Sequence, residues 1–300
     1  MRGAALAASV VLSIAATTAC GGNDAGGGDG TVGVVASFYP LAEVAQRVGG
    51  DRVKVTNLTP AGGEPHDLEL TSRDLDRIET ADVVVHLGGG FQPAVEKVLG
   101  RADGEVIDVL SPDLAVLDAA DDHDHGTDPH VWLDPSILRQ IAGRVEAALA
   151  AADPAGAPVF AANTKAYGNE LVALDREFQQ GLAQCDRRLI VTTHASFGYL
   201  ARRYNLTQEP ISGLAPEAEP DPKRLADLAR LVRSGGTTTV FYETLVSPRV
   251  AQTLARETGA QTAVLDPIEG LSKDDQRAGK SYASIMRENL AALRTALACR

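Results

Sequence analysis

The sequence predicts an α/β protein with two pseudo-repeated α/β lobes, mostly parallel sheets, and one long backbone helix that joins the lobes. Three observations predict this architecture: β-branched runs alternate with helical patterns, the two halves of the chain resemble each other, and a long helical stretch separates them. Ligands of open α/β sheets bind beyond the carboxyl ends of the strands. We therefore expect a ligand cleft between the lobes.

The internal repeat is visible in three successive blocks, offset by about 155–159 residues. The paired segments are 34–50 with 192–206, 58–85 with 213–241, and 104–109 with 260–266. The first pair shares Ala-Ser-Phe after a β-branched run, and the second shares Glu-Pro ahead of a helical pattern. Such a steady offset predicts that both lobes are built to one plan.

The stretch at 154–185 has apolar residues at three- and four-residue steps, which is the period of a helix. A helix of about 25 residues would be nearly 40 Å long at 1.5 Å per residue. We expect a stiff connection and modest motion of the lobes. The alternative is an ordinary surface helix in one larger domain.

Composition and pattern divide the chain into five segments. These are a signal peptide with a lipobox-like end at 1–20, a Gly-rich tether at 21–30, an N-terminal lobe at 31–150, a linking helix at 151–186 and a C-terminal lobe at 187–300. The apolar run of the first segment is too short to span a membrane. Cys20 stands where lipoproteins carry their lipidated cysteine, which predicts a lipid anchor. Thr17, where an aliphatic residue is usual, leaves a plain secreted protein as the alternative.

The remaining composition limits the possible partners. Lys and Arg number 28 and Asp and Glu number 40, so the net charge is 28 − 40 = −12, which argues against nucleic-acid binding and favours cations. Cys185 and Cys299 form an even pair that reads as a disulfide in an extracytoplasmic protein, with two free thiols as the alternative. We expect a monomer.

Four potential metal ligands lie at strand ends or just before a helix. His66 comes after the strand expected at 53–59, His194 after 188–193, Asp266 after 261–265, and His130 just before a helix capped by Asp134. Three imidazoles and one carboxylate suit tetrahedral Zn²⁺, whereas Mn²⁺ prefers more oxygen ligands. His86 also follows an expected strand but lacks a surrounding motif, so it is left out of the set.

These residues lie in motifs that resemble those of the metal-specific substrate-binding proteins of ABC transporters, the zinc and manganese family (cluster A-I). The motifs are "GGEPHDLELTSRDL", "DPHVWLDP", "THASFGYLARRYNL", "LAPEAEPDP", "FYETLVSP" and "VLDPIEGL", and the resemblance covers about residues 31–300. It implies two α/β lobes joined by one long helix, and a lipid-anchored protein on the outer face of the cytoplasmic membrane or a periplasmic one. It also implies a partnership with an ABC permease and its separate ATPase chain.

By the same resemblance, the metal ligands would be His66, His130, His194 and Asp266, with Glu64 as a possible additional ligand. Manganese members usually have a carboxylate at the position of His194, so the imidazole favours zinc. The implied function is high-affinity capture of Zn²⁺ for import, with manganese or another divalent metal as the alternative cargo. The acidic stretch with His123 and His125 would be a weak capture site, or else a solvated loop that binds no metal.

Two other classes of function remain as alternatives. A zinc hydrolase would need an open coordination position and a general base, but four protein ligands close the site, so we expect no enzyme. A metal-binding adhesin is the third possibility, although no feature of the sequence predicts a protein-binding face.

Overall fold

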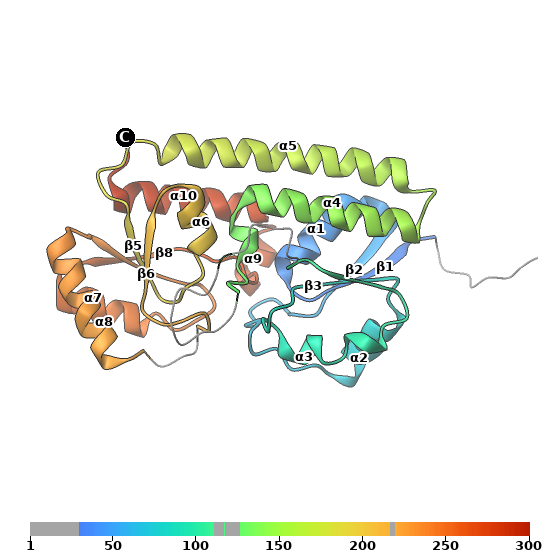
Figure 1. The fold of residues 1–300 in the computed structure, drawn as a ribbon, viewed down its shortest axis with the longest axis horizontal. Helices are drawn as coiled ribbons and strands as arrows, with labels where there is room; N and C mark the ends of the chain where they lie inside the picture. The colour runs from blue at the N-terminus through green and yellow to red at the C-terminus, as the bar shows by residue number, and fades with distance from the viewer. Residues whose placement is uncertain (1–29, 111–116, 118–126, 217–219) are drawn as a thin grey trace, which may run out of the picture. The chain divides into compact units, whose positions relative to one another are not determined.

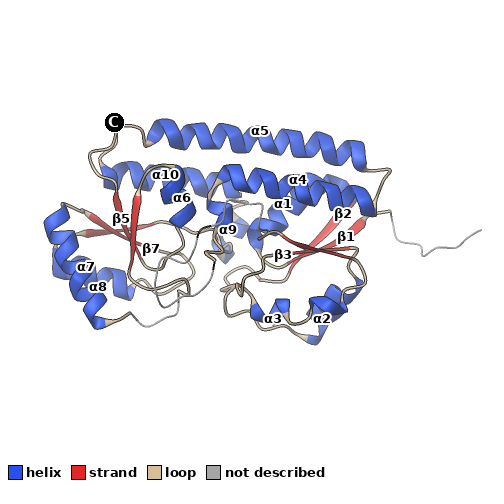
Figure 2. Cartoon of the chain, in the orientation of Figure 1, coloured by secondary structure: helices blue, strands red, loops and turns tan. Residues whose placement is uncertain are grey.

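The computed structural model describes residues 30–110, 117, 127–216 and 220–300, of which Thr31–Arg300 form one compact unit. His123, His125 and Cys20 lie outside the described residues. Figures 1 and 2 show two sheets flanked by helices, with the long helix α5 (Ala157–Gly181) running along both halves. Among the described residues, no helix is both long and apolar enough to cross a bilayer.

The first sheet has four parallel strands in the order β2-β1-β3-β4. The strands are β1 (Val32–Ala36), β2 (Val53–Asn57), β3 (Val83–His86) and β4 (Glu105–Asp108). The helical segments of this half are α1 (Tyr39–Gly49), η1 (Gly50–Arg52), α2 (Ser72–Thr80), α3 (Pro93–Glu96), η2 (Leu99–Arg101), η3 (Val131–Leu133) and α4 (Pro135–Ala152). The central strands are rich in valine and buried, because helices cover both faces of a parallel sheet.

The second sheet repeats this topology in the order β6-β5-β7-β8, again with parallel strands. Its strands are β5 (Leu189–Thr192), β6 (Thr207–Pro210), β7 (Thr239–Tyr242) and β8 (Gln261–Val264). Its helices are α6 (Gly198–Arg203), α7 (Pro222–Gly235), α8 (Arg249–Thr258), α9 (Lys273–Arg277) and α10 (Tyr282–Leu297). Because the first strand of each half lies between the second and the third, the two sheets have the same order, as the repeat predicted.

The 25-residue helix α5 packs against α1 and α4 of the first half and α10 of the second. One large apolar cluster runs through both halves and includes the buried face of α5. The sequence prediction of a long helix between two α/β lobes is therefore confirmed. The exact boundaries of the five segments stay a prediction.

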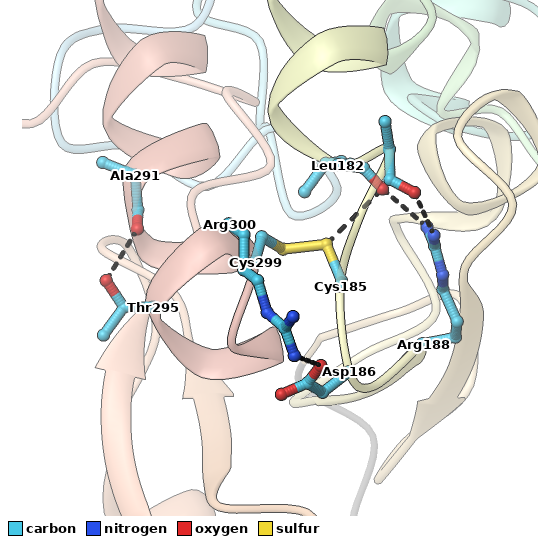
Figure 3. The surroundings of a disulfide bond; sticks show 9 residues. Leu182, Cys185, Asp186, Arg188, Ala291, Thr295, Cys299 and Arg300 are labelled. Atoms are coloured by element: carbon cyan, nitrogen blue, oxygen red, sulfur yellow. Dashed lines mark hydrogen bonds and ion pairs between the residues drawn. A yellow bond between two sulfur atoms is a disulfide. The ribbon is translucent and has the colours of Figure 1, made fainter.

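The disulfide between Cys185 and Cys299 joins the segment that follows α5 to the C-terminal end of the chain (Figure 3). Backbone hydrogen bonds flank it, from Arg187 N to Leu297 O and from Arg300 N to Gln184 O. The link fastens the end of α5 to the end of α10. The structure confirms the predicted pairing.

Candidate metal centre

Three imidazoles and one carboxylate converge at one point in the structure: His66, His130, His194 and Glu269. One potential ligand atom from each lies within 4.8 Å of all the others. The Glu269 Oε1 atom is 3.2 Å from Nε2 of His130, 3.2 Å from Nε2 of His194, and 3.7 Å from Nε2 of His66. Two nitrogen donors from the first half therefore face a nitrogen and an oxygen donor from the second.

The fold brings these four side chains together from four separate loops. His66 lies in the loop that follows β2, and His130 immediately precedes η3. His194 lies two residues beyond β5, and Glu269 lies in the loop that follows β8. His66, His194 and Glu269 thus come from loops at the carboxyl ends of parallel strands, where α/β sheets form their ligand sites. Asp134 caps α4, which begins with Pro135, as the sequence predicted.

Three of the four side chains of the centre are shielded from water, and His66 is partly exposed. His130 and His194 have no exposed surface, and Glu269 is 1% exposed. The ring of Phe91 packs edge-on against His66, with 4.5 Å between centroids, and Trp132 lies against Phe91 and His130. Burial among aromatic rings strengthens every electrostatic interaction inside the site.

Two further carboxylates orient the two buried imidazoles. Asp128 Oδ1 lies 2.7 Å from His130 Nδ1, and Glu243 Oε1 lies 2.7 Å from His194 Nδ1. With its Nδ1 proton donated to a carboxylate, a neutral imidazole presents the lone pair of Nε2 to the centre. This pairing of imidazole and carboxylate is typical of metal ligands, since it fixes the tautomer and raises ligand basicity.

The surroundings of the centre shift the pKa values of its buried imidazoles and of Glu269. Burial lowers the pKa of His194, but the negative charges of Glu243 and Glu269 outweigh it and raise that pKa well above its usual value. Burial likewise lowers the pKa of His130, but its bonds to Asp128 and Glu269 raise the net value. Burial raises the pKa of Glu269, but the charge of His194 and the hydrogen bonds from the imidazoles bring it well below the ordinary value. The surrounding negative charges thus favour protonation of the two buried imidazoles, and the imidazoles favour the ionised form of Glu269.

Glu64 lies close enough to this centre to respond to its charge. Burial, reinforced by the negative charge of Glu269, raises the pKa of Glu64 to about 8. Its Oε1 atom accepts a hydrogen bond from His66 N, while Glu64 Oε2 and His66 Nε2 are buried without a hydrogen-bond partner among the described residues. A buried polar atom without a partner is costly, so both atoms are free to bind a cation.

Asp266 occupies a different place from the one that the sequence predicted. Its Oδ1 atom accepts a hydrogen bond from Ile268 N at 2.7 Å, and its Oδ2 atom accepts one from Thr244 Oγ1 at 2.8 Å. Both oxygens therefore bond within the loop region, and Asp266 is not part of the four-residue group. Glu269, three residues further along the chain, supplies the carboxylate instead.

Sequence reasoning also missed the two orienting carboxylates, although signals for both were present. Asp128 stands two residues before His130 in "DPHVWLDP", and Glu243 directly follows β7 in "FYETLVSP". A carboxylate just beyond a strand occupies the same kind of position as the residues that the sequence analysis chose as candidate ligands. His86, excluded from the predicted set, is the last residue of β3 and lies outside the group, and burial lowers its pKa.

Hydrogen bonds tie the ligand-bearing loops of the two halves together. Trp132, two residues after His130, donates from Nε1 to Pro267 O at 2.7 Å. Tyr282, at the start of α10, donates from its hydroxyl to Trp132 O at 2.6 Å. In the loop before His66, Gly62 N donates to Leu271 O at 2.8 Å. These bonds hold the three loops in register without a metal ion.

Comparison with known proteins agrees with this fold. The family model described as zinc-uptake complex component A, periplasmic, matches residues 34–296. The chain belongs to this zinc-uptake family.

Curated members of the zinc-uptake family match nearly the whole chain. The zinc-binding lipoprotein AdcA of Streptococcus pneumoniae serotype 4 is 36% identical over 279 residues, which is 89% of this chain and 56% of that protein. The chain therefore spans about half the length of AdcA. The high-affinity zinc uptake system protein ZnuA of Bacillus subtilis is 33% identical, and the match covers 93% of both chains.

Solved structures of the zinc-uptake family have the same architecture. The Zn(II)-bound ZnuA-like domain of AdcA from Streptococcus pneumoniae matches with a TM-score of 0.78 and 35% identity. The match covers 89% of this chain and 99% of that one. The α/β class with two parallel sheets is thus confirmed by both the topology and the comparison.

Proposed function

We propose that this chain is an extracytoplasmic carrier that binds Zn²⁺ with high affinity and delivers it to an ABC importer. The observation that carries the proposal is the convergence of three imidazole Nε2 atoms on one oxygen of Glu269. Three nitrogen donors and one oxygen donor match the ligands and coordination number that tetrahedral zinc prefers. The ligand set proposed is His66, His130, His194 and Glu269.

Charge balance supports a divalent cargo. Negative charge around His130 and His194 raises the pKa values of these imidazoles, which favours their protonated form beside the Glu269 carboxylate. Zinc binds only neutral imidazole, so binding replaces these protons with two positive charges on the metal. The net charge of the buried centre then changes little, which limits the cost of placing Zn²⁺ in a site closed to water.

The same geometry favours a carrier over an enzyme. Four protein ligands leave no position for the metal-bound water that a zinc hydrolase activates. Glu64, the nearby carboxylate with a pKa of about 8, would exchange with a member of this ligand set. The name of the relative AdcA, a zinc-binding lipoprotein, and that of ZnuA, a zinc uptake system protein, agree with a transport role.

The cellular arrangement is part of the proposal. A lipid on Cys20 would hold the chain as a monomer at the outer face of the cytoplasmic membrane, with the Gly-rich segment 21–30 as the tether. A separate permease and a separate ATPase chain would receive the metal. Labelling with a radioactive fatty acid tests the anchor, because Cys20→Ala abolishes incorporation if the cysteine is the lipidation site.

A metal titration tests the proposed function. The purified chain is stripped of metal and titrated with Zn²⁺ and Mn²⁺ in competition with a chromophoric chelator at pH 7.5. We expect one Zn²⁺ per chain with a sub-micromolar Kd, much weaker Mn²⁺ binding, and loss of tight binding in His66→Ala. His86→Ala is the matched control, since His86 is a buried strand-end imidazole outside the group. Zinc binding that survives His66→Ala, or Mn²⁺ binding tighter than Zn²⁺, contradicts the proposal.

A further inference from the structure

We propose that Asp266, Asn289 and Thr244 form a positioning clamp that aims Glu269 into the metal centre, and that Asp266 is not itself a ligand. The inference rests on the proposed function, because the clamp matters only if the four-residue group binds metal. It assigns a role to three residues that do not belong to the convergent group.

Asn289 holds the backbone at the start of the Glu269 loop. Its Oδ1 atom accepts a hydrogen bond from Asp266 N at 2.8 Å, and its Nδ2 atom donates to Asp266 O at 2.7 Å. Asn289 lies on α10 and is 2% exposed, so this pair of bonds is sheltered from competing water. A side-chain amide that bonds both the N–H and the C=O of one residue fixes that peptide segment against the helix.

Asp266 continues the restraint toward Glu269. One of its oxygens accepts from Ile268 N, which closes a tight turn, and the other accepts from Thr244 Oγ1. Thr244 directly follows Glu243, the residue that orients His194. The segment after β7 therefore restrains both the imidazole and the loop that carries the carboxylate.

The turn enforces an unusual backbone conformation next to Glu269. Ile268 has a φ of 58°, in the left-handed region that β-branched residues rarely adopt. Such a conformation persists only where the surroundings over-determine it, and it is found mostly at functional sites. The bond from Ile268 N to Asp266 and the complete burial of the Ile268 side chain supply that restraint here. The left-handed residue redirects the chain so that the next side chain, Glu269, reaches the three imidazoles.

A cavity of about 380 Å³ borders all three clamp residues, together with Asp275, Lys280 and Glu288. Space is thus already open beside the clamp. Truncation of a clamp side chain enlarges this space instead of creating a sealed void, which lowers the cost to the fold. The clamp can therefore be altered in a chain that still folds.

Substitutions at Asp266 separate a clamp from a ligand. Asp266→Asn keeps an oxygen that accepts from Ile268 N, and the rotating hydroxyl of Thr244 can accept from its amide. If Asp266 belongs to the clamp, Asp266→Asn changes the zinc Kd by no more than about threefold, whereas Asp266→Ala weakens binding by about 10- to 100-fold. If Asp266→Asn weakens binding as much as Asp266→Ala, Asp266 acts as a ligand and the clamp assignment is overturned.

Variants remote from the metal provide the second arm. Asn289→Ala removes both backbone bonds, and Thr244→Val removes one donor at nearly constant shape. We expect Asn289→Ala to weaken zinc binding by about tenfold and Thr244→Val by a smaller factor. Asn163→Ala is the matched control: Asn163 also donates from its amide to a backbone carbonyl, that of Val48, but it lies outside the clamp. Its zinc Kd should equal that of the wild type.

Cobalt substitution gives a readout that a loss of stability alone does not move. Four-coordinate Co²⁺ has intense visible d–d bands, and these weaken when a ligand is lost or misplaced. We expect weakened bands in Asp266→Ala and Asn289→Ala at saturating Co²⁺, with wild-type bands in Asp266→Asn and Asn163→Ala. Wild-type Kd values and bands in both alanine variants overturn the clamp but leave zinc binding intact. Failure of the wild-type chain to bind zinc overturns the proposed function instead.

Discussion

Glu243 offers the sharpest test of how the protein holds a metal ligand indirectly. Its Oε1 atom accepts from His194 Nδ1 at 2.7 Å and also from the hydroxyl of Thr193, and Glu243 is 4% exposed. Glu243→Ala removes this anchor and leaves His194 free to rotate or to change tautomer. Glu243→Gln keeps an acceptor of the same size but removes the negative charge.

The magnitude follows from the burial of this bond. A buried hydrogen bond that involves a charged group contributes about 1.5–3 kcal/mol. Since about 1.4 kcal/mol corresponds to a factor of ten in Kd, the loss predicts zinc binding weaker by about 10- to 100-fold. We expect Glu243→Gln to weaken zinc binding by a factor near the lower limit of this range and Glu243→Ala by a factor near the upper limit. His194→Ala should cost more than either, because it removes a ligand and leaves Glu243 as a buried charge without its partner.

A chelator competition at pH 7.5 measures these Kd values, and thermal unfolding of the metal-free variants reports any loss of fold. Glu209→Gln is the matched control, because Glu209 is a carboxylate on β6 that pairs with Arg224 rather than with an imidazole. Its zinc Kd should be unchanged. Wild-type zinc affinity in Glu243→Ala, or equal weakening in Glu209→Gln, would refute the reasoning that the carboxylate of Glu243 sets how strongly His194 binds zinc.

Four further outcomes are expected. Protons compete with zinc for His130 and His194, because the pKa values of these imidazoles are raised in the metal-free chain. The Kd for zinc measured by chelator competition should therefore rise steadily as the pH falls from about 8 to 5.5. A Kd that does not change with pH would exclude an imidazole site. The same raised values stabilise the metal-free chain below the unfolded-state pKa near 6.5, and this stability is lost as the pH rises through the folded-state values, so the zinc-induced increase in Tm should grow with pH. Glu64, with a pKa of about 8, should release its proton when zinc binds at pH 7. Calorimetry in buffers of different ionisation enthalpy counts the protons released per zinc ion bound, and this number should be smaller by about one for Glu64→Gln. An equal number would mean that Glu64 stays protonated beside the metal. Replacement of Cys185 and Cys299 by serine should lower the free energy of unfolding, measured by urea titration, by at most about 4–5 kcal/mol, given the 114-residue separation. The zinc Kd should not change. A shift in Kd would show that the disulfide also shapes the metal centre.

The architecture was predictable because it depends on patterns that recur over many residues. Alternating strand and helix patterns define the α/β class, and the internal repeat predicts two sheets of the same strand order. The helical period at 154–185 predicted a helix of about 25 residues, and α5 spans Ala157–Gly181. Long periodic segments average over local exceptions, which explains why this part of the prediction succeeded.

The imidazoles of the centre were predictable for a different reason. The chain has six histidines, so a histidine directly after an expected strand is an informative event. His194 satisfies that criterion, His66 lies in the loop after an expected strand, and His130 precedes a capped helix. The structure brings the three together. The rarity of the residue type and the topology of the sheet were sufficient for these three.

The carboxylates were not predictable at the same level. With 40 acidic residues, the position of one beyond a strand carries little information, which is why Asp128 and Glu243 were missed. The structure places Glu269, rather than the predicted Asp266, beside the three imidazoles, because the left-handed turn at Ile268, which periodicity does not reveal, directs the later residue there. Which carboxylate faces the imidazoles depends on one backbone dihedral angle and on the bonds that hold it.

The central claim is that one zinc ion is held by His66, His130, His194 and Glu269. The most direct test is a crystal structure of the zinc-loaded chain with anomalous diffraction recorded on both sides of the zinc absorption edge. We predict a single strong anomalous peak within about 2.0–2.2 Å of one nitrogen from each of the three imidazoles and of a Glu269 oxygen. A peak coordinated by Asp266 in place of Glu269, or a zinc ion bound outside this group, would contradict the account.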